Sequence, residues 1–489
     1  MNITNIGSRR EVCWDDTLIE RAEGMKIEMH KPSYRNDALI CDKPWEGNVC
    51  CYFSLIHDDG KLRLYYRGRN YDVNADGSAA DKVTQTAMCA AISDDGITFH
   101  RINAGIVSRD GNSDNNILTE DIRDNMFFFK DTNPACPPEA RFKALAERKD
   151  GLGLFESADG VHFEEKRILA NDGAYDSLNV CFWDEETKQY YLFYRGVHGE
   201  GTVDGKWAEG AGKARHTTVV RDIRMRISKD FMNWSEPQIL QYGDEAEDLE
   251  LYTNCVQKYY RAPHMFIGFP TRYSDRHKDT ASFPYLPDRE HRERYIKLSG
   301  RGGTVMTDTC IMTSRDGVNF RRSDKAFMTP GPERGNNWYY GDGYLCHGMV
   351  ETPSPIAGEP NELSLYMPVN YRSGNVVLRR YGIRIDGFFS WGADLKGGKV
   401  VTKPIIFTGD TLSMNFATSA LGSVRVRILD ADGNPIEGYD SGNHFGDSIN
   451  RPILFEKPLA DLSGTPIRLE ISINDADLYS FQFTYAEGQ

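Results

Sequence analysis

The stretch Ser93-Asp94-Asp95-Gly96-Ile97-Thr98-Phe99 decides the fold, because the chain writes the same pattern three more times. In each copy an Asp follows the Ser by two residues, an aromatic residue follows it by six, and Gly usually comes after the Asp. Ser and Asp side chains bond nearby backbone N–H groups, and Gly adopts positive φ, so each copy predicts a hairpin corner. The other copies are Ser157–Phe163, Ser228–Trp234 and Ser314–Phe320.

The copies recur at intervals of roughly 60 to 90 residues, which is the size of one propeller blade with its loops. Between them lie short alternating runs rich in aromatic and β-branched residues, which are typical of strands. The sequence therefore predicts an all-β, five-bladed β-propeller, and the segment Asp16–Pro32 is expected to close the ring. The five expected inner strands are Val49–His57, Met126–Lys130, Asn179–Asp184, Tyr252–Gln257 and Leu345–Val350.

A second domain is predicted after the composition break at Trp391. From Gly397 onward the chain consists of short alternating strands separated by Asp- and Asn-containing turns, which favours a β-sandwich. The predicted domains are a propeller with its N-terminal closing segment over residues 1–392 and a C-terminal β-sandwich over residues 393–489.

The overall charge bears on partners and compartment. A formal net charge of −14 argues against nucleic acid and anionic membranes as partners, and no stretch approaches the roughly 20 apolar residues of a membrane span. The first residues, MNITNIGSRREVCWDD, lack an apolar signal core, so we expect a cytoplasmic or already processed chain. The ten cysteines have no metal-type spacing and are expected to be buried free thiols; no cofactor or metal motif is found.

Carboxylates stand near the ends of four expected inner strands, and these ends line the axial pit of a propeller. Two carboxylates across a sugar ring can cleave a glycosidic bond, because one protonates the leaving oxygen while the other acts as base or nucleophile. Acids at strand ends also cap turns, so both roles stay open at this point. The candidate catalytic residues, expected around one axial pocket, are Glu46, Asp131, Asp176 and Glu250.

Aromatic, polar and basic residues near these acids are candidates for substrate binding. Aromatic rings stack on the apolar face of a sugar, although core packing is the alternative role for each. A basic group in an acidic protein fits an anionic group on the carbohydrate, with a salt bridge to a nearby acid as the other interpretation. The candidates are Asp42, Trp45, Ser177, Asn179, Tyr252, Arg261, His264, Arg272 and Trp338.

With these residues in view, the chain resembles the five-bladed β-propeller glycoside hydrolases, and is most similar to family-32-like bacterial proteins. The resemblance is carried by Lys43-Pro44-Trp45-Glu46, Asp131-Thr132-Asn133-Pro134, Tyr175-Asp176-Ser177-Leu178-Asn179, Leu251-Tyr252-Thr253-Asn254 and Arg261–His264. It implies a glycoside hydrolase in which three acids come from different blades: Glu46 or Asp42, then Asp131 or Asp176, then Glu250.

The chain also departs from family 32. The Trp-Met-Asn-Asp-Pro-Asn-Gly-like motif is absent, and Arg123-Asp124-Asn125 is a poor match to the Arg-Asp-Pro signature, so fructan cleavage is not implied. Two other functions remain open from the sequence. One is a non-catalytic carbohydrate-binding propeller, and the other is a phosphorylase similar to family 130, which needs one acid and a phosphate-binding group such as Arg261, His264 and Arg272.

Overall fold

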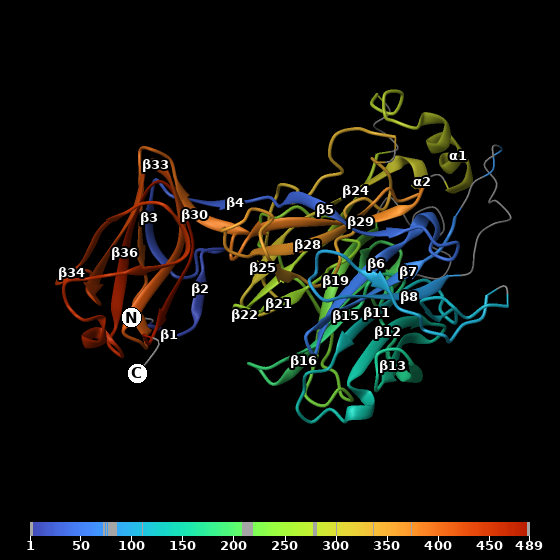
Figure 1. Ribbon diagram of the computed structural model, residues 1–489, viewed down its shortest axis with the longest axis horizontal. Coiled ribbons are helices and arrows are strands. Elements are labelled where there is room, and N and C mark those ends of the chain that lie inside the picture. Colours follow the sequence, from blue (N-terminus) through green and yellow to red (C-terminus); the bar gives the residue numbers. More distant parts are fainter. Residues whose placement is uncertain are drawn as a thin grey trace.

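The computed structural model describes residues 3–71, 74, 76, 86–109, 111–207, 219–276, 281–299, 301–335, 337–372 and 374–486. The chain forms two bodies of β-strands that lie side by side, with both termini in the smaller body (Figure 1). The larger body contains five separate sheets of four or five strands each, arranged as the blades of a propeller. The predicted five-bladed propeller is thereby confirmed.

Each blade is an antiparallel sheet, and its strands are given from the innermost outward. The outermost strand of blade 5 comes from the beginning of the chain. Blade 1 contains β6 (Cys51–Asp58), β7 (Lys61–Gly68), β8 (Ala87–Ser93), β9 (His100–Arg101) and β10 (Ile117–Thr119). Blade 2 contains β11 (Met126–Lys130), β12 (Phe142–Arg148), β13 (Gly151–Ser157) and β14 (Glu164–Ala170). Blade 3 contains β15 (Val180–Asp184), β16 (Gln189–Gly199), β19 (Val219–Ser228) and β20 (Gln238–Ile239).

Blade 4 contains β21 (Gln257–Tyr259), β22 (Ala262–Gly268), β25 (Met312–Ser314) and β26 (Phe320–Arg322). Blade 5 contains β27 (Val350–Thr352), β28 (Glu362–Val369), β29 (Val376–Arg384) and β5 (Ser33–Cys41). Aromatic rings fill the space between neighbouring blades: Tyr65 of blade 1 stacks on Phe128 of blade 2 with ring centroids 4.3 Å apart. Such rings bury large apolar areas and hold the blades together.

The repeated Ser-x-Asp turn joins the third and fourth strands of a blade, as its chemistry predicts. In blade 1 the Ser93 hydroxyl accepts a hydrogen bond from the Gly96 N–H at 2.9 Å, and the Asp95 carboxylate accepts one from the Ile97 N–H at 2.8 Å. Gly96 has φ = +71°, which only Gly adopts without strain. Burial opposes ionisation, yet these N–H donors lower the pKa of Asp95, so its carboxylate serves the turn rather than catalysis.

The ring is closed by β5, not by the segment 16–32 that the sequence suggested. β5 pairs antiparallel with β29 from Cys41↔Val376 to Ser33↔Gly382 and so completes blade 5 with an N-terminal strand. The segment 16–32 instead supplies β3 (Ile19–Glu23) and β4 (Lys26–Met29), which pair with strands of the smaller body. The tertiary pairing is what distinguishes the two stretches.

The smaller body is a β-sandwich whose long strands are β33 (Thr411–Asp430) and β36 (Ile467–Thr484). The N-terminal strands β1 (Thr4–Gly7) and β2 (Arg10–Val12), together with β3 and β4, are hydrogen-bonded into it. The sandwich is therefore built from both ends of the chain, a feature that the sequence did not reveal. Its other strands are β30 (Phe389–Ala393), β31 (Gly398–Thr402), β32 (Ile405–Phe407), β34 (Pro435–His444) and β35 (Asp447–Ile453).

Two hairpins and two helices project from the propeller. The hairpins are β17 (Thr202–Val203) with β18 (Lys206–Trp207), and β23 (Thr271–Asp275) with β24 (Val305–Thr309). The helices α1 (Arg289–Ser299) and α2 (Arg301–Thr304) lie between the strands of the second hairpin, at the end of the propeller that points away from the sandwich (Figure 1). Neither α1 nor α2, nor any other helix in the described ranges, has the length and apolarity needed to cross a membrane.

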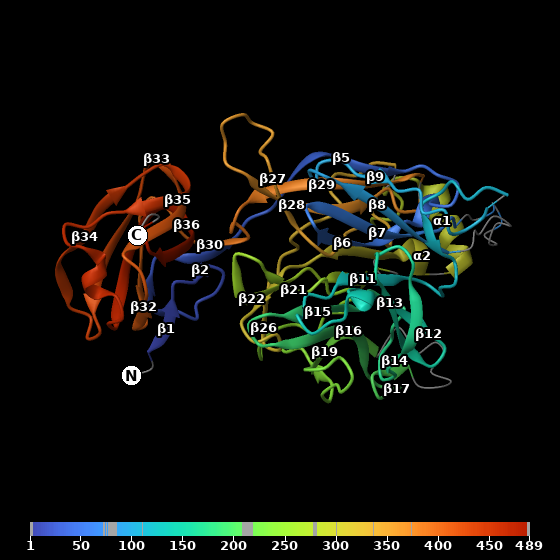
Figure 2. The same cartoon turned by 60° about the horizontal axis from the view of Figure 1, so that its bottom comes forward.

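Asp386 joins the two bodies. Its carboxylate accepts hydrogen bonds from the Tyr259 hydroxyl of blade 4 at 2.6 Å and from the Ser480 hydroxyl of the sandwich at 2.7 Å. Its backbone carbonyl accepts one from the Trp14 indole at 2.8 Å. The sandwich therefore covers the end of the propeller where the β21–β22 turn lies, as Figure 2 also shows, and leaves the opposite end open.

Candidate functional site

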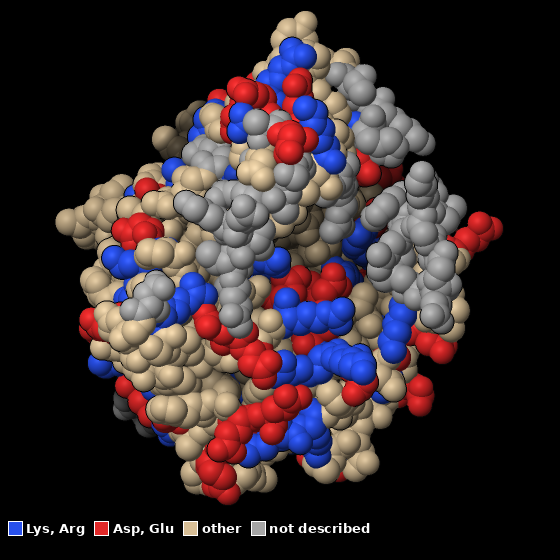
Figure 3. Space-filling model, turned by 90° about the vertical axis from the view of Figure 1, so that its right-hand side faces the viewer, with Lys and Arg blue, Asp and Glu red and all other residues tan. Residues whose placement is uncertain are grey.

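Acid–arginine pairs gather at the open end of the propeller. Figure 3 shows this face, with basic and acidic side chains close together around its hollowed middle. Asp124 precedes the inner strand β11 and forms an ion pair with Arg67 at the end of β7. Asp176 precedes β15 and pairs with Arg195 of β16. These starts of inner strands are the positions that line the pit of a propeller.

A third pair of the same kind lies beside them. Glu250 pairs with Arg221, which comes from the third strand of blade 3. The guanidinium groups of Arg195 and Arg221 both lie over the ring of Tyr252, at 4.7 and 5.6 Å from its centroid. The Asp176 and Glu250 pairs therefore approach the same tyrosine.

Tyrosine rings and arginines form the wall of the pit. They enclose a cavity of about 240 Å³. Its lining residues are Val49, Tyr52, Arg67, Arg69, Tyr71, Asp124, Asp176, Tyr252, Tyr340, Tyr371 and Arg372. Tyr344 stacks between Tyr52 and Tyr252, with ring centroids 5.7 Å from each. Aromatic faces beside carboxylates are the surfaces that a sugar ring contacts in a binding site.

Two carboxyl groups of the site hold their protons more tightly than usual. Burial raises the pKa of Glu250, and the facing Arg221 only partly opposes this effect. Burial also raises the pKa of Glu147, with the charge of Asp176 as a further cause. Perturbed carboxyls in a pit are candidates for proton transfer. Within the described ranges, no group of three or more His, Cys, Asp or Glu is placed to hold a metal ion.

Ser177 and Asn179 support the Asp176 loop from inside the fold and do not line the cavity. The Ser177 hydroxyl donates to the Tyr252 carbonyl at 2.6 Å, and the Asn179 side-chain amide donates to the Tyr175 and Ser177 carbonyls at 2.9 Å each. Both residues are fully buried. They position Asp176 and Tyr252 relative to each other, and the expected direct contact with substrate is not available to them.

Glu46 lies away from the cavity. Its carboxylate is fully buried and accepts hydrogen bonds from the Tyr66 hydroxyl at 2.6 Å and from Arg101 at 2.7 and 2.8 Å. Asp42 also binds Arg101, at 3.0 Å, and Trp45 donates its indole N–H to Asn116 at 2.7 Å. These residues stabilise the entry to blade 1, so the structure does not bring Glu46 to the pit with Asp176 and Glu250.

Asp131 lies at the far end of β11 from Asp124. It is buried, pairs with Lys143 at 2.8 Å and accepts a hydrogen bond from the Tyr190 hydroxyl at 2.9 Å. The adjacent Lys130 contacts Asp58 at the end of β6, so this acid belongs to the sandwich-facing end of the ring. The expectation that Asp131 lies close to the catalytic pocket is therefore not met.

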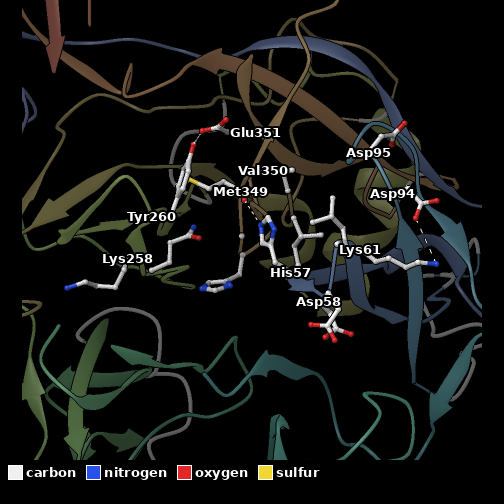
Figure 4. A pocket seen from close by; sticks show the side chains of 17 residues that line it. His57, Asp58, Lys61, Asp94, Asp95, Lys258, Tyr260, Met349, Val350 and Glu351 are labelled. Atoms are coloured by element: carbon white, nitrogen blue, oxygen red, sulfur yellow. Dashed lines mark hydrogen bonds and ion pairs between the residues drawn. The ribbon is translucent and has the colours of Figure 1, made fainter. Parts of the chain in front are cut away.

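The sandwich-facing end carries a larger cavity, of about 740 Å³, lined by residues of blades 1, 4 and 5 (Figure 4). Its acids are engaged within the fold: Asp58 by Arg63 at 2.7 Å, and Glu351 by the Tyr260 hydroxyl. His57 and His347 bond backbone carbonyls at 3.1 Å each. This cavity is larger than the pit at the open end, but the acid–arginine pairs from three blades lie at the smaller pit.

The basic residues expected to meet an anionic group are each paired within the fold, and only Arg272 lies near Glu250, opposite Leu251. Arg261 binds Asp386 at 3.0 Å, and His264 faces Glu11 at 3.3 Å, so both contribute to the junction with the sandwich. Arg272 forms a two-pronged pair with Asp308 across the β23–β24 hairpin, at 2.6 and 2.9 Å. Trp338 is half-buried in the loop before blade 5 and donates its indole N–H to the Gly331 carbonyl at 3.0 Å.

The sequence reading missed Asp124 and the arginines. A usable signal was present, because the second strands of blades 1 and 3 contain the same three residues, Tyr66-Arg67-Gly68 and Tyr194-Arg195-Gly196. In addition, Asp124 is the acid that precedes β11 as Asp176 precedes β15.

No protein-family model matches this chain, and no curated protein matches it. It is similar in fold to a thermostable family-43 glycoside hydrolase (10% identity, 70% of this chain and 93% of that one, TM-score 0.41). It is also similar to a GH62 α-L-arabinofuranosidase catalytic domain from Coprinopsis cinerea (8%, 73% and 99%, 0.40) and to the β-1,2-mannobiose phosphorylase from Listeria innocua (11%, 73% and 97%, 0.41). The five-bladed propeller fold is established by the chain's own sheets.

Proposed function

We propose that this chain cleaves a glycosidic bond in the pit at the open end of its propeller. The observation that carries the proposal is the convergence of Asp124, Asp176 and Glu250, each from a different blade, beside a tyrosine-lined cavity. Glycosidic cleavage needs one carboxyl that gives a proton and a second that stays ionised. The pit offers groups of both kinds.

Glu250 is assigned the role of general acid. Because burial raises its pKa, it is more readily protonated than an exposed Glu and can give a proton to the leaving oxygen. Asp176 is the partner that acts as base or nucleophile, with its side chain 47% exposed at the pit. Asp124, fixed by Arg67, positions the substrate between them.

The roles of Arg195 and Arg221 follow from the same contacts. Arg195 holds the Asp176 carboxylate in place beside the pit. Arg221 lowers the pKa of Glu250, but burial raises that pKa by more. The Glu250 pair therefore suits a proton donor, as an acid–base mechanism requires.

The proposal is tested by incubating the full chain with a broad panel of oligosaccharides and polysaccharides, with reducing ends as the readout, in the presence and absence of inorganic phosphate. Release of reducing sugar without phosphate supports hydrolysis. Turnover that depends on phosphate identifies a phosphorylase instead. Saturable binding of a glycan without any turnover identifies a carbohydrate-binding propeller and contradicts the proposal.

The acid role of Glu250 has its own test, with aryl glycosides of the sugar that the panel identifies. A dinitrophenolate leaves without protonation, whereas a poor leaving group needs the acid. Glu250→Gln is expected to lose about 100-fold or more in kcat/KM on the poor leaving group and much less on the good one. Equal losses on both would remove Glu250 from this role.

A further inference from the structure

The pit contains more arginine side chains than are paired with its carboxylates. Asp124 is paired with Arg67 and Asp176 with Arg195. Two further arginines line the same cavity, Arg69 and Arg372, and within the described parts of the chain neither one has a carboxylate partner. The chain as a whole carries a net charge of −14, so two unpaired cations in one small cavity run against its general composition.

Among the residues that the structure describes, neither arginine side chain has a hydrogen-bond acceptor. Within this set, Nε of Arg69 and both Nε and Nη1 of Arg372 are buried without a partner. Tyrosine rings hold the guanidinium groups instead: Arg372 lies 4.9 Å from the centroid of Tyr295 and 5.0 Å from that of Tyr340. Buried N–H donors without acceptors are costly, and a ligand oxyanion that accepts from them removes the cost.

The backbone around Arg372 is strained in a way that fixes its place. Arg372 has φ = +68° and Asn370 has φ = +67°, a region that non-glycine residues rarely adopt. The position is held on both sides, because the Arg372 N–H donates to the Asn48 carbonyl at 2.7 Å and its carbonyl accepts from His291 Nε2 at 2.7 Å. Strain that the surroundings over-determine is typical of ligand clamps.

Arg69 and Arg372 also face a common point. Their guanidinium carbons lie 5.9 and 5.6 Å from the centroid of the same ring, Tyr71. A guanidinium presents a planar fork of donors that matches a planar carboxylate, and it does so best in a site that is shielded from water. The two forks flank the cavity into which Asp124 and Asp176 also open.

We propose that Arg69 and Arg372 form an anion subsite that binds the carboxylate of a uronic acid residue in the substrate. This inference rests on the proposed function for the assignment of the ligand as a sugar. The assignment of a negative charge to the ligand does not depend on it. The carboxylate is carried by the glycan and is not a free oxyanion such as inorganic phosphate. The sugar ring then lies against the tyrosines, with its glycosidic bond toward Asp176 and Glu250.

The test is binding, measured by calorimetry on the full chain. The probes are short oligosaccharides of galacturonate, glucuronate, mannuronate and guluronate, their methyl esters, and inorganic phosphate alone. The variants are Arg69→Gln, Arg372→Gln and Arg372→Lys, and the matched control is Arg379→Gln, a partly exposed arginine that pairs with Asp37 on the outer edge of blade 5. Circular dichroism verifies the fold of each variant; if Arg372→Gln is unfolded, Arg69→Gln and Arg372→Lys decide.

We expect one of the acidic probes to bind at least about tenfold more tightly than its methyl ester. Arg69→Gln and Arg372→Gln should each lose at least that factor, Arg372→Lys should lose part of it, and Arg379→Gln should not change. Equal binding of acid and ester, no binding of any acidic probe, or unchanged affinity in both Gln variants would overturn the subsite. The subsite would also be overturned if inorganic phosphate bound in place of the acidic sugar.

The outcomes separate this subsite from the proposed function. If an acidic probe binds through both arginines but no glycan is cleaved, the subsite stands and the cleavage fails. If a glycan is cleaved but no acidic probe binds more tightly than its methyl ester, the cleavage stands and the subsite fails.

Discussion

Arg67 of blade 1 and Asp124 of the loop before blade 2 form an ion pair that links two blades at the edge of the pit. Arg67 is nearly buried and also donates to the Tyr371 hydroxyl at 3.0 Å and to the Val49 carbonyl at 3.1 Å. One guanidinium therefore fixes a carboxylate, an aromatic wall residue and the start of an inner strand.

Arg67→Met should destabilise the protein more than Asp124→Asn does. Loss of the arginine leaves the carboxylate and two acceptors without their donor, whereas loss of the charge on Asp124 leaves Arg67 with its other partners. We expect a loss of about 2 kcal/mol or more in the free energy of unfolding for Arg67→Met and about 1 kcal/mol for Asp124→Asn. Urea unfolding of both single variants and the double variant measures these values; a coupling energy of zero would contradict the pair.

The pH dependence of turnover should follow Glu250. A general acid works only when protonated, so activity must fall as pH rises through its pKa, and burial places that pKa above the ordinary value of 4.5. Arg221 opposes this shift, so Arg221→Met should move the alkaline limb of kcat/KM to higher pH. The measurement is a pH–rate profile of the wild type and the variant. A limb that stays in place or moves to lower pH would contradict the assignment.

The junction with the sandwich should weaken in acid. His264 and Arg315 lower the pKa of Glu11 from 4.5 to about 2, against the effect of burial. A lowered folded-state pKa contributes stability above the unfolded value near 4.5, and this contribution is lost as pH falls toward 2. It amounts to about 3 kcal/mol, from about 1.4 kcal/mol per pKa unit. Glu11→Gln should flatten the thermal stability between pH 5 and pH 2.5, and an unchanged slope would argue against this role.

Removal of residues 393–489 alone should be more harmful than removal of both parts of the sandwich. The N-terminal residues Ile6, Cys13 and Leu18 are buried in the sandwich core and lose their partners when it is deleted. A chain of residues 1–392 would expose this apolar surface. We expect a chain of residues 33–392, which keeps β5, to yield several-fold more soluble protein than residues 1–392. Equal yields would contradict this view of the N-terminal strands.

The sequence predicted what depends on local interactions and missed what depends on packing. The Ser-x-Asp turns bond within a few residues, so their repetition revealed four of the five blades, and strand-like runs after Leu345 indicated the fifth. Glu46 and Asp176 look alike in sequence, as acids before inner strands. They differ because Arg101, which is distant in the chain, buries and saturates Glu46, whereas Asp176 stays open to the pit.

The basic residues were misjudged for a related reason. Arg261 and His264 lie at the sandwich-facing end, where Asp386 pairs with Arg261 and the N-terminal Glu11 faces His264. Arg67 and Arg195 sit in strands whose register places them at the open end. Their repeated Tyr-Arg-Gly contexts were visible, but the end of the ring that each one faces depends on the pairing of whole blades.

The most direct measurement is the release of reducing ends by the wild type, Glu250→Gln and Glu351→Gln at equal concentration on the glycan that the panel identifies. Glu351 is the matched control because it lies in the larger cavity at the opposite end, where it contacts Tyr260. We predict that Glu250→Gln loses at least about 100-fold of the wild-type rate while Glu351→Gln keeps it. Loss of turnover in Glu351→Gln with full activity in Glu250→Gln would place the reaction at the wrong end of the propeller for this mechanism and contradict it.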